Sequence, residues 1–250
     1  MERSLTTRIQ RFAAARFSPE EAFGLHLTLG VLALLLAMAG FAQLAEAVVD
    51  GAPITAVDLE LAAWLHTHAH ASDGLRQFML AVTHLHSTPG VLTLAALGAY
   101  GFYRRGLPDW ALTMLVTVPG GMLLNVAMKY TFARARPYFE EPIVVLTTYS
   151  FPSGHSVAAT LLYGVLACYF TRCARSWPAR AAIVLAACLM VALVAGSRLY
   201  LGAHYLSDVL AGIAEGCAWL SICVTGGATL HRRRRARAAT GAKRRNTIST

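Results

Sequence analysis

Long apolar stretches, separated by short polar segments, run along most of the chain. Six of them approach or exceed the length of about 20 residues that a membrane-spanning helix needs. They lie at about 23–44, 79–103, 110–128, 157–173, 179–196 and 205–230. The first is too long for the core of a signal peptide, so we expect it to be retained. The pattern predicts an all-α, polytopic membrane protein with six transmembrane helices.

Between the first two spans, residues 50–75 carry apolar side chains at helical spacing. The apolar positions are Ile54, Val57, Leu61, Trp64 and Leu65. Asp58, Glu60 and His66 lie off this stripe. Such a stripe suits a helix that lies in the membrane interface, with Trp64 at the level of the headgroups. We therefore expect an interfacial amphipathic helix between spans one and two.

Composition and charge support this topology. Of the 250 residues, 56% are hydrophobic and 14% charged, whereas a soluble domain carries about a quarter charged residues. If the N-terminus is cytoplasmic, most of the 22 Lys and Arg residues fall on the cytoplasmic side, as the positive-inside rule requires. A basic tail can also bind RNA or anionic headgroups. Because topology accounts for the net charge of +9, we expect no nucleic-acid partner.

We interpret residues 1–250 as one domain with basic cytoplasmic tails at about 1–20 and 231–250. The second tail is rich in small and basic residues, so we expect it to be disordered. With both termini cytoplasmic, the connections between spans three and four and between spans five and six open on the other face of the membrane. Three polar motifs meet on that face.

The first motif is "KYTFARARP", which contains Lys129, Arg136 and Pro137. Lys129 and Arg136 are two helical turns apart, so they share a face if the helix persists to Pro137. The second motif is "FPSGHS", in which Ser153, Gly154 and His155 precede the fourth span. Glycine lets the backbone approach a ligand closely, and the amides at a helix N-terminus favour an anion.

The third motif, "SRLYLGAHYLSD", joins two apolar stretches. His204 and Asp208 are one helical turn apart, so the carboxylate can hold the imidazole. Gly202 allows the turn that brings Arg198 back toward them. Charged side chains are costly near lipid, so their presence here indicates a functional site.

Together the motifs supply three cations, a hydroxyl, helix-start amides, two histidines and one carboxylate. Arginine forks grip the equatorial oxygens of a phosphoryl group. One histidine can attack in line, and the other can protonate the leaving oxygen. No cluster of carboxylates is available to hold magnesium. We therefore expect phosphoryl transfer with no metal and no cofactor.

The three motifs, in this order and spacing, resemble those of the type 2 phosphatidic acid phosphatase superfamily. Its members are integral membrane lipid phosphate phosphatases, related in their active sites to vanadium haloperoxidases and bacterial acid phosphatases. The motifs span about 125–210, and the six-span layout extends the resemblance to the whole chain.

The resemblance implies a role for each motif residue. His204 is the nucleophile that forms a phosphohistidine, and Asp208 orients it. His155 is the general acid for the leaving group and then the base for the hydrolytic water. The expected phosphate ligands are Lys129, Arg136, Ser153, Gly154 and Arg198.

We thus expect a membrane phosphatase that hydrolyses a lipid phosphate or diphosphate at the periplasmic face of a bacterial inner membrane. By resemblance, undecaprenyl diphosphate is the first substrate to test. Phosphatidylglycerophosphate, phosphatidic acid and a lipid A phosphate stay open. So do a lipid phosphotransferase and a non-catalytic phospholipid carrier. The expected partners are the bilayer and the lipid substrate.

Each residue also has a simpler interpretation. Any one of the three cations could be an interfacial anchor that snorkels, "PSGH" alone could merely start a helix, and His204 with Asp208 could be a structural pair. All three motifs would then have to coincide by chance.

Other polar residues receive no catalytic role. The His66, His68 and His70 tract resembles a metal site but has no obvious further ligand. Glu140 and Glu141 suit solvated counter-charges, and we expect Arg134 to point away, toward lipid headgroups. Glu215 interrupts the last span, where a carboxylate normally has a partner that sequence alone does not name.

Overall fold

The computed structural model describes residues 25–248, and all regular structure in that range is helical. The helices are α2 Leu25–Val49, α3 Ile54–Ala71, α4 Asp73–Leu85, α5 Thr88–Arg104, α6 Pro108–Phe132, α7 Gly154–Cys173, α8 Trp177–Tyr200 and α9 Leu206–Ile248. The tail expected at about 1–20 lies outside the described residues. A long connection between α6 and α7 is the main non-helical segment of this range.

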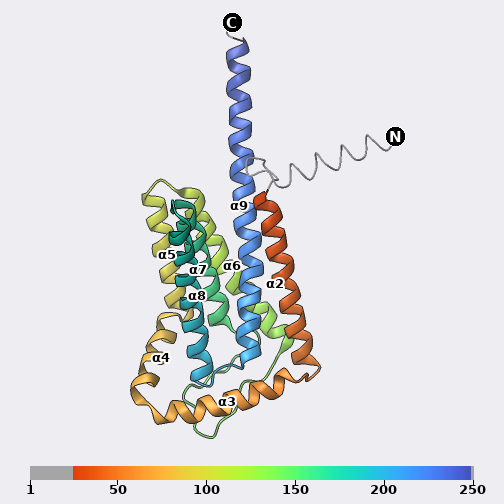
Figure 1. The fold of residues 1–250 in the computed structure, drawn as a ribbon, viewed down its shortest axis with the longest axis vertical. Helices are drawn as coiled ribbons and strands as arrows, with labels where there is room; N and C mark the ends of the chain where they lie inside the picture. The colour runs from red at the N-terminus through yellow and green to blue at the C-terminus, as the bar shows by residue number, and fades with distance from the viewer. Residues whose placement is uncertain (1–24, 249–250) are drawn as a thin grey trace, which may run out of the picture.

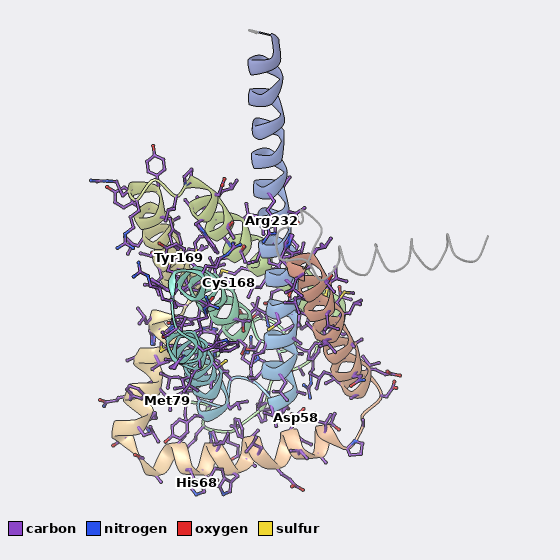
Figure 2. The ribbon with its side chains drawn as sticks, turned by 45° about the horizontal axis from the view of Figure 1, so that its top comes forward. Asp58, His68, Met79, Cys168, Tyr169 and Arg232 are labelled. Atoms are coloured by element: carbon purple, nitrogen blue, oxygen red, sulfur yellow. The ribbon has the colours of Figure 1, made fainter. Side chains whose placement is uncertain are left out.

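The long helices run side by side, and α3 lies across one end of the bundle (Figure 1). We call this the α3 end. The α6–α7 connection and the α8–α9 turn also lie at the α3 end, whereas α9 extends beyond the opposite end (Figure 1). In Figure 2, Asp58 and His68 accordingly lie on α3, far from Arg232.

Within residues 25–248, five helices are long and apolar enough to cross a membrane: α2, α6, α7, α8 and the Leu206–Leu230 part of α9. Large apolar side chains cover their outward faces, as at Leu36 on α2 and Leu123 on α6. Lipid tails solvate such surfaces, so their exposure needs no further protein partner. The predicted all-α membrane fold is confirmed.

The predicted span at 79–103 is two helices, α4 and α5, rather than one. Pro89 lies in the first turn of α5, where it has no N–H to donate and its ring blocks a preceding helical turn. The corner is tight, because a Cβ on Gly90 would stand 2.1 Å from the Leu85 carbonyl oxygen. The 17 residues of α5 rise about 25 Å, less than the roughly 30 Å of the hydrocarbon core. The structure therefore supports six passages only if α4 and α5 share one.

The helix predicted between the first two spans is present as α3, but the burial of one of its polar residues was not expected. Asp58 is only 1% exposed and faces the bundle, whereas Trp64 is 56% exposed. The reason is electrostatic: Asp58 finds a cation and a hydroxyl on neighbouring segments, which compensate the cost of burying a carboxylate.

Small residues let α9 approach α7 closely and so fix the base of the site. A Cβ on Gly216 would meet the Thr160 side chain at 2.8 Å, and one on Gly164 would meet Leu220 at 2.4 Å. Such contacts replace the hydrophobic effect as the source of helix packing in a bilayer. The helical backbone of α9 continues to Ile248, so the disorder expected for 231–250 is not found over its described part.

Candidate active site

The structure brings the eight predicted site residues into one cluster at the α3 end. They come from the end of α6 and the loop after it, the first turn of α7, and the α8–α9 turn. Many of the polar residues here are buried, including Ser153, Arg198, His204 and Asp208. A polar cluster that is withdrawn from water beside a membrane needs internal partners for its charges.

His204 and Asp208 form the centre of this cluster. Nδ1 of His204 lies 3.3 Å from Oδ2 of Asp208, so the carboxylate holds the ring at the nitrogen that is not Nε2. The geometry favours the tautomer with its proton on Nδ1, which leaves the Nε2 lone pair directed away from Asp208. Burial, together with the charges of Arg136 and Arg198, lowers the pKa of His204 to about 3 despite the opposing effect of Asp208. The imidazole is therefore neutral at physiological pH.

Arg136 faces the other ring nitrogen of His204. Its Nη1 lies 3.2 Å from Nε2 of His204 and donates to the Ala203 carbonyl at 2.6 Å. Its Nε and Nη2 donate to the backbone and side chain of Thr148. Burial lowers the pKa of Arg136, and Asp208 opposes this effect. These contacts hold the guanidinium of Arg136 beside the His204 ring.

Lys129 reaches the same region by a different route from the one expected. α6 ends at Phe132, because Ala133 adopts a left-handed conformation with φ of 46° and donates its N–H to the Lys129 carbonyl. The helix therefore does not persist to Arg136, and the two cations share no helical face. The Lys129 ammonium donates to the carbonyls of Tyr149 and Ser150, at 2.7 and 3.2 Å.

The first turn of α7 carries the backbone that was predicted to bind an anion. Ser153 is the N-cap and Gly154 the first helical residue. A Cβ on Gly154 would stand 3.0 Å from Oδ1 of Asn125 and 3.8 Å from Cε of Lys129, so only glycine keeps this approach open. The Ser153 N–H donates to the Asp208 carbonyl at 2.9 Å, which joins the α7 start to the α9 start.

Arg198 and His155 meet at Thr83 of α4. Arg198 is 3% exposed, donates through Nη1 to the Thr83 hydroxyl, and has a buried Nε without a protein partner. The Thr83 backbone hydrogen-bonds His155, which also lies within range of the Arg198 charge. Gly202 has φ of +67°, and the turn it permits lets the Ala203 N–H donate to the Arg198 carbonyl.

Three contributors to the site were not predicted: Thr83, Ser150 and Arg134. The Ser150 hydroxyl donates to Oδ2 of Asp208. Arg134 was expected to point toward headgroups, but it donates to Oδ1 of Asp208 at 2.6 Å. α6 ends at Phe132, before both arginines, so helical spacing does not apply to them. A helix end placed before Arg134 would have allowed both arginines to be assigned to the site.

Glu215 has a partner after all, on α6. Nδ2 of Asn125 donates to Oε2 of Glu215 at 2.9 Å, and more weakly to the Pro152 carbonyl. The other carboxyl oxygen, Oε1, is buried without a protein partner. This pair lies one turn of α6 before Lys129, behind the phosphate-binding residues.

The histidine tract does not form a metal cluster in the described part of the chain. His66 stacks on Phe139 with ring centroids 3.9 Å apart and bonds the Glu141 carbonyl at 3.0 Å. His68 packs against Trp64, and the His70 side chain lies outside the described residues. Among the side chains described, no three His, Cys, Asp or Glu gather as a metal site would require.

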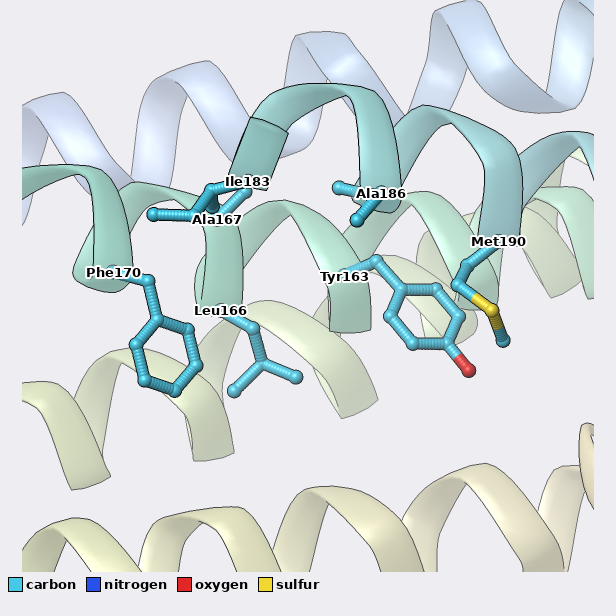
Figure 3. A pocket seen from close by; sticks show the side chains of 8 residues that line it. Tyr163, Leu166, Ala167, Phe170, Ile183, Ala186 and Met190 are labelled. Carbon is cyan, nitrogen blue, oxygen red and sulfur yellow. The ribbon is translucent and has the colours of Figure 1, made fainter. Parts of the chain in front are cut away.

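A separate hollow of about 240 Å³ lies between α7 and α8. Its lining is almost entirely apolar, with the phenol of Tyr163 at one end and Phe170 toward the other (Figure 3). Tyr163 follows His155 by about 12 Å along α7. Its lining contains no charged group, so this hollow is not a candidate for the phosphate site.

Known proteins are similar to this chain in both sequence and fold. The model of the PAP2 superfamily matches residues 110–232. Phosphatidylglycerophosphatase B of Bacillus subtilis is 35% identical over 144 residues, which are 57% of this chain and 70% of that protein. An undecaprenyl-diphosphatase of Sulfolobus acidocaldarius is 30% identical over 115 residues, 44% of this chain and 51% of that protein.

A solved structure agrees with the sequence matches. The crystal structure of a transmembrane PAP2-type phosphatidylglycerolphosphate phosphatase from Bacillus subtilis superposes with a TM-score of 0.67 at 29% identity. The match covers 77% of this chain and 94% of that one. The chain belongs to the PAP2 superfamily and is a membrane phosphatase that hydrolyses phosphate esters.

Proposed function

We propose that this phosphatase hydrolyses a lipid phosphate through a phosphohistidine on Nε2 of His204. One observation carries the proposal: the His204 ring is held by Asp208 on Nδ1 and faces Arg136 on Nε2. A neutral, oriented imidazole with a cation beside its lone pair is what attack on an anionic phosphorus requires.

The phosphate binds among three cations and the start of α7. Arg136 and Arg198 bind non-bridging oxygens with their planar guanidinium groups, and Lys129 adds a third charge. The Ser153 side chain and the Gly154 amide complete the set, where the dipole of α7 favours an anion. The buried, unpartnered Nε of Arg198 supports this role.

The reaction proceeds in two displacements. Nε2 of His204 attacks phosphorus, the ester P–O bond breaks, and protonated His155 gives its proton to the leaving lipid oxygen. His155 then takes a proton from water, whose oxygen attacks the phosphohistidine and releases inorganic phosphate. Asp208 stabilises the positive charge that His204 gains while it carries the phosphoryl group. The cations neutralise the phosphoryl oxygens, so the scheme uses no metal.

Among lipid substrates, phosphatidylglycerophosphate comes first and undecaprenyl diphosphate second. The resemblance alone put them in the opposite order. The B. subtilis phosphatidylglycerophosphatase B match is more identical and covers more of both chains than the undecaprenyl-diphosphatase match. Phosphatidic acid and a lipid A phosphate remain to be tested beside them.

We further propose that the site faces the periplasm of a bacterial inner membrane. The start of α2 and the C-terminal part of α9 then lie on the cytoplasmic side. Four basic residues lie in the last turn of α5 or α7 or just after it, at the end of the bundle remote from α3 (Figure 1): Arg104, Arg105, Arg172 and Arg175. Positive residues gather on the cytoplasmic side. Six passages, with α4 and α5 forming the second, return the chain to the side from which it started.

The test measures phosphate release from each of the four lipids in detergent, with EDTA present, by wild type and His204→Ala. Activity of the wild type that survives chelation, with none from the variant, is expected. Acid-labile, base-stable label on the wild type after a brief reaction with a ³²P-labelled substrate would identify the phosphohistidine. Full activity of His204→Ala would exclude this mechanism.

The same assay separates the remaining alternatives. A lipid phosphotransferase would transfer the labelled phosphoryl group to an added alcohol rather than to water. A non-catalytic carrier would bind the lipid but release no phosphate. The His204–Asp208 pair favours hydrolysis over carriage, since binding alone does not require an oriented nucleophile.

A further inference from the structure

Arg134 makes two ion pairs and a hydrogen bond near the site that the proposed mechanism does not use. Its Nη1 donates to Oδ1 of Asp208 at 2.6 Å and to the Ser207 hydroxyl at 2.7 Å. Its Nη2 donates to Oδ2 of Asp58 at 2.9 Å. The guanidinium carbon lies 4.4 Å from the centre of the Tyr205 ring. One arginine thus joins α3, the α6–α7 connection and the start of α9.

Asp58 completes the link from the α3 side. Its Oδ1 accepts from the Ser207 N–H at 2.9 Å, and its Oδ2 from the Ser207 hydroxyl at 2.5 Å. The Ser207 N–H lies in the first turn of α9, where helix amides have no partner of their own. Asp58 therefore caps α9 from another helix, with its charge at the favourable end of the dipole.

These contacts divide the two oxygens of Asp208 between two tasks. Oδ1 is bound by Arg134. Oδ2 accepts from Ser150 and from the Tyr205 N–H, and it faces Nδ1 of His204. Because Oδ1 is held, the carboxyl group cannot rotate about its Cβ–Cγ bond, and Oδ2 stays directed at the histidine.

Charge distinguishes this arginine from the phosphate ligands. Arg134 lies between two carboxylates, Asp58 and Asp208, whose field repels a phosphate. Burial opposes its charge, but Asp208 and Asp58 outweigh that effect and raise the pKa of Arg134. Arg136, by contrast, faces His204 and backbone carbonyls and makes no ion pair with either carboxylate.

We propose that Arg134 and Asp58 are positioning residues of the phosphatase, which hold Asp208 so that His204 presents Nε2 to the phosphate. The inference rests on the proposed role of His204. In this arrangement α3 contributes to catalysis indirectly. Its Asp58 holds Arg134, and Arg134 holds Asp208, the residue that orients His204.

The test compares Arg134→Gln, Arg134→Lys and Asp58→Asn with wild type on the substrate that wild type hydrolyses. We expect Arg134→Gln to lower kcat about 100-fold, the scale of a misaligned reacting group, with KM changed less than about threefold. Asp58→Asn keeps one acceptor oxygen for the Ser207 N–H, but it loses the ion pair and the second oxygen, which accepts from Arg134 and the Ser207 hydroxyl. We therefore expect a loss of about tenfold. Arg134→Lys keeps the charge and should recover part of kcat.

A second readout separates positioning from simple damage to the fold. Orthovanadate mimics the pentacoordinate phosphoryl group and needs the oriented nucleophile, whereas inorganic phosphate needs only the cations. We expect Arg134→Gln to weaken inhibition by orthovanadate at least about tenfold and inhibition by phosphate little. Arg76→Gln, which removes an exposed Arg76–Asp73 pair on α4, is the matched control and should match wild type.

Each contrary result has one meaning. Unchanged kcat in Arg134→Gln, or a raised KM with unchanged kcat, would overturn the positioning role. Equal weakening of phosphate and orthovanadate would show general damage and would also overturn it. If Arg134→Gln does not accumulate in membranes, Asp58→Asn and Arg134→Lys decide by the same criteria. Activity of His204→Ala in parallel would instead refute the proposed function itself.

Discussion

Nη1 of Arg136 lies 3.2 Å from Nε2 of His204, and the same atom donates to the Ala203 carbonyl at 2.6 Å. The guanidinium therefore directs a proton toward the lone pair that would attack phosphorus. In the proposed mechanism, a phosphate oxygen that accepts from Arg136 would draw this donor away from the nitrogen. Substrate binding and release of the nucleophile would then be coupled through one side chain.

Arg136→Lys tests this coupling. A lysine has no planar fork, so it cannot serve Thr148, Ala203 and a phosphate oxygen together. We expect kcat/KM for phosphate release to fall about 100-fold. Arg105→Lys, at the opposite end of the bundle, controls for the loss of a guanidinium and should retain wild-type activity. Retention of activity by Arg136→Lys would show that charge alone is sufficient.

The His204 titration is directly observable. Its pKa is lowered to about 3 by burial and by the nearby arginines, so the ring should stay neutral from pH 8 down to about 5. NMR of histidine-labelled protein, with His204→Gln to identify the resonance, measures this. Protonation near the ordinary value of 6.5 would contradict the burial of the ring.

The same shift makes stability depend on pH in a defined direction. Between pH 6.5 and about 3 the unfolded chain binds a proton at His204 that the folded chain does not, so acidification favours unfolding. We expect the contribution of His204 to the free energy of unfolding to fall by about 1.4 kcal/mol per pH unit in this window. Thermal unfolding in detergent at pH 6.5 and pH 5 should show a smaller drop for His204→Asn than for wild type.

Gly154→Ala should damage the phosphate site without damaging the bundle. The new Cβ would stand 3.0 Å from Oδ1 of Asn125, which must shift, and 3.8 Å from Cε of Lys129, in ordinary contact. The added methyl group would therefore crowd the start of α7, where the anion is proposed to bind. We expect a rise in the inhibition constant of inorganic phosphate of at least about tenfold. Gly101→Ala on α5, where a Cβ meets nothing within 4 Å, is the matched control. Equal phosphate affinity in both variants would argue against binding at the α7 start.

Asn125 and Glu215 should differ in their effect on stability. Asn125→Ala removes the donor at 2.9 Å from Glu215 and leaves a buried carboxyl group without that partner, which costs about 1–3 kcal/mol. Glu215→Gln keeps an acceptor for Asn125 and should cost less. Thermal unfolding of the two variants in the same detergent ranks them. A larger loss from Glu215→Gln would mean that the charge of Glu215, rather than its hydrogen bond, stabilises the bundle.

Sequence patterns predicted correctly those features that depend on residues close together in the chain. The apolar stretches predicted the long helices because a bilayer demands length and composition together. The pairing of His204 with Asp208 followed from helical spacing, and the turn at Gly202 from its conformational freedom. These features are local, so they can be inferred within a few residues.

The failures concern relations between segments. The burial of Asp58 was not predicted, because its partners, Arg134 and Ser207, are distant in sequence. Arg134 was misjudged because α6 was expected to continue, although Ala133 ends it. The division of 79–103 into α4 and α5 depended on Pro89, which alone does not show whether a helix bends or breaks.

The unbroken course of α9 sets the depth of the catalytic centre in the bilayer. Asp208 and Arg232 are separated along this helix by about 36 Å at the usual rise per residue, slightly more than the roughly 30 Å hydrocarbon core. With Arg232 among the headgroups of one leaflet, Asp208 lies at the surface of the other. A thicker membrane draws the centre inward, and a thinner one exposes it or tilts the helix. The enzyme is therefore matched to a membrane thickness as well as to a substrate.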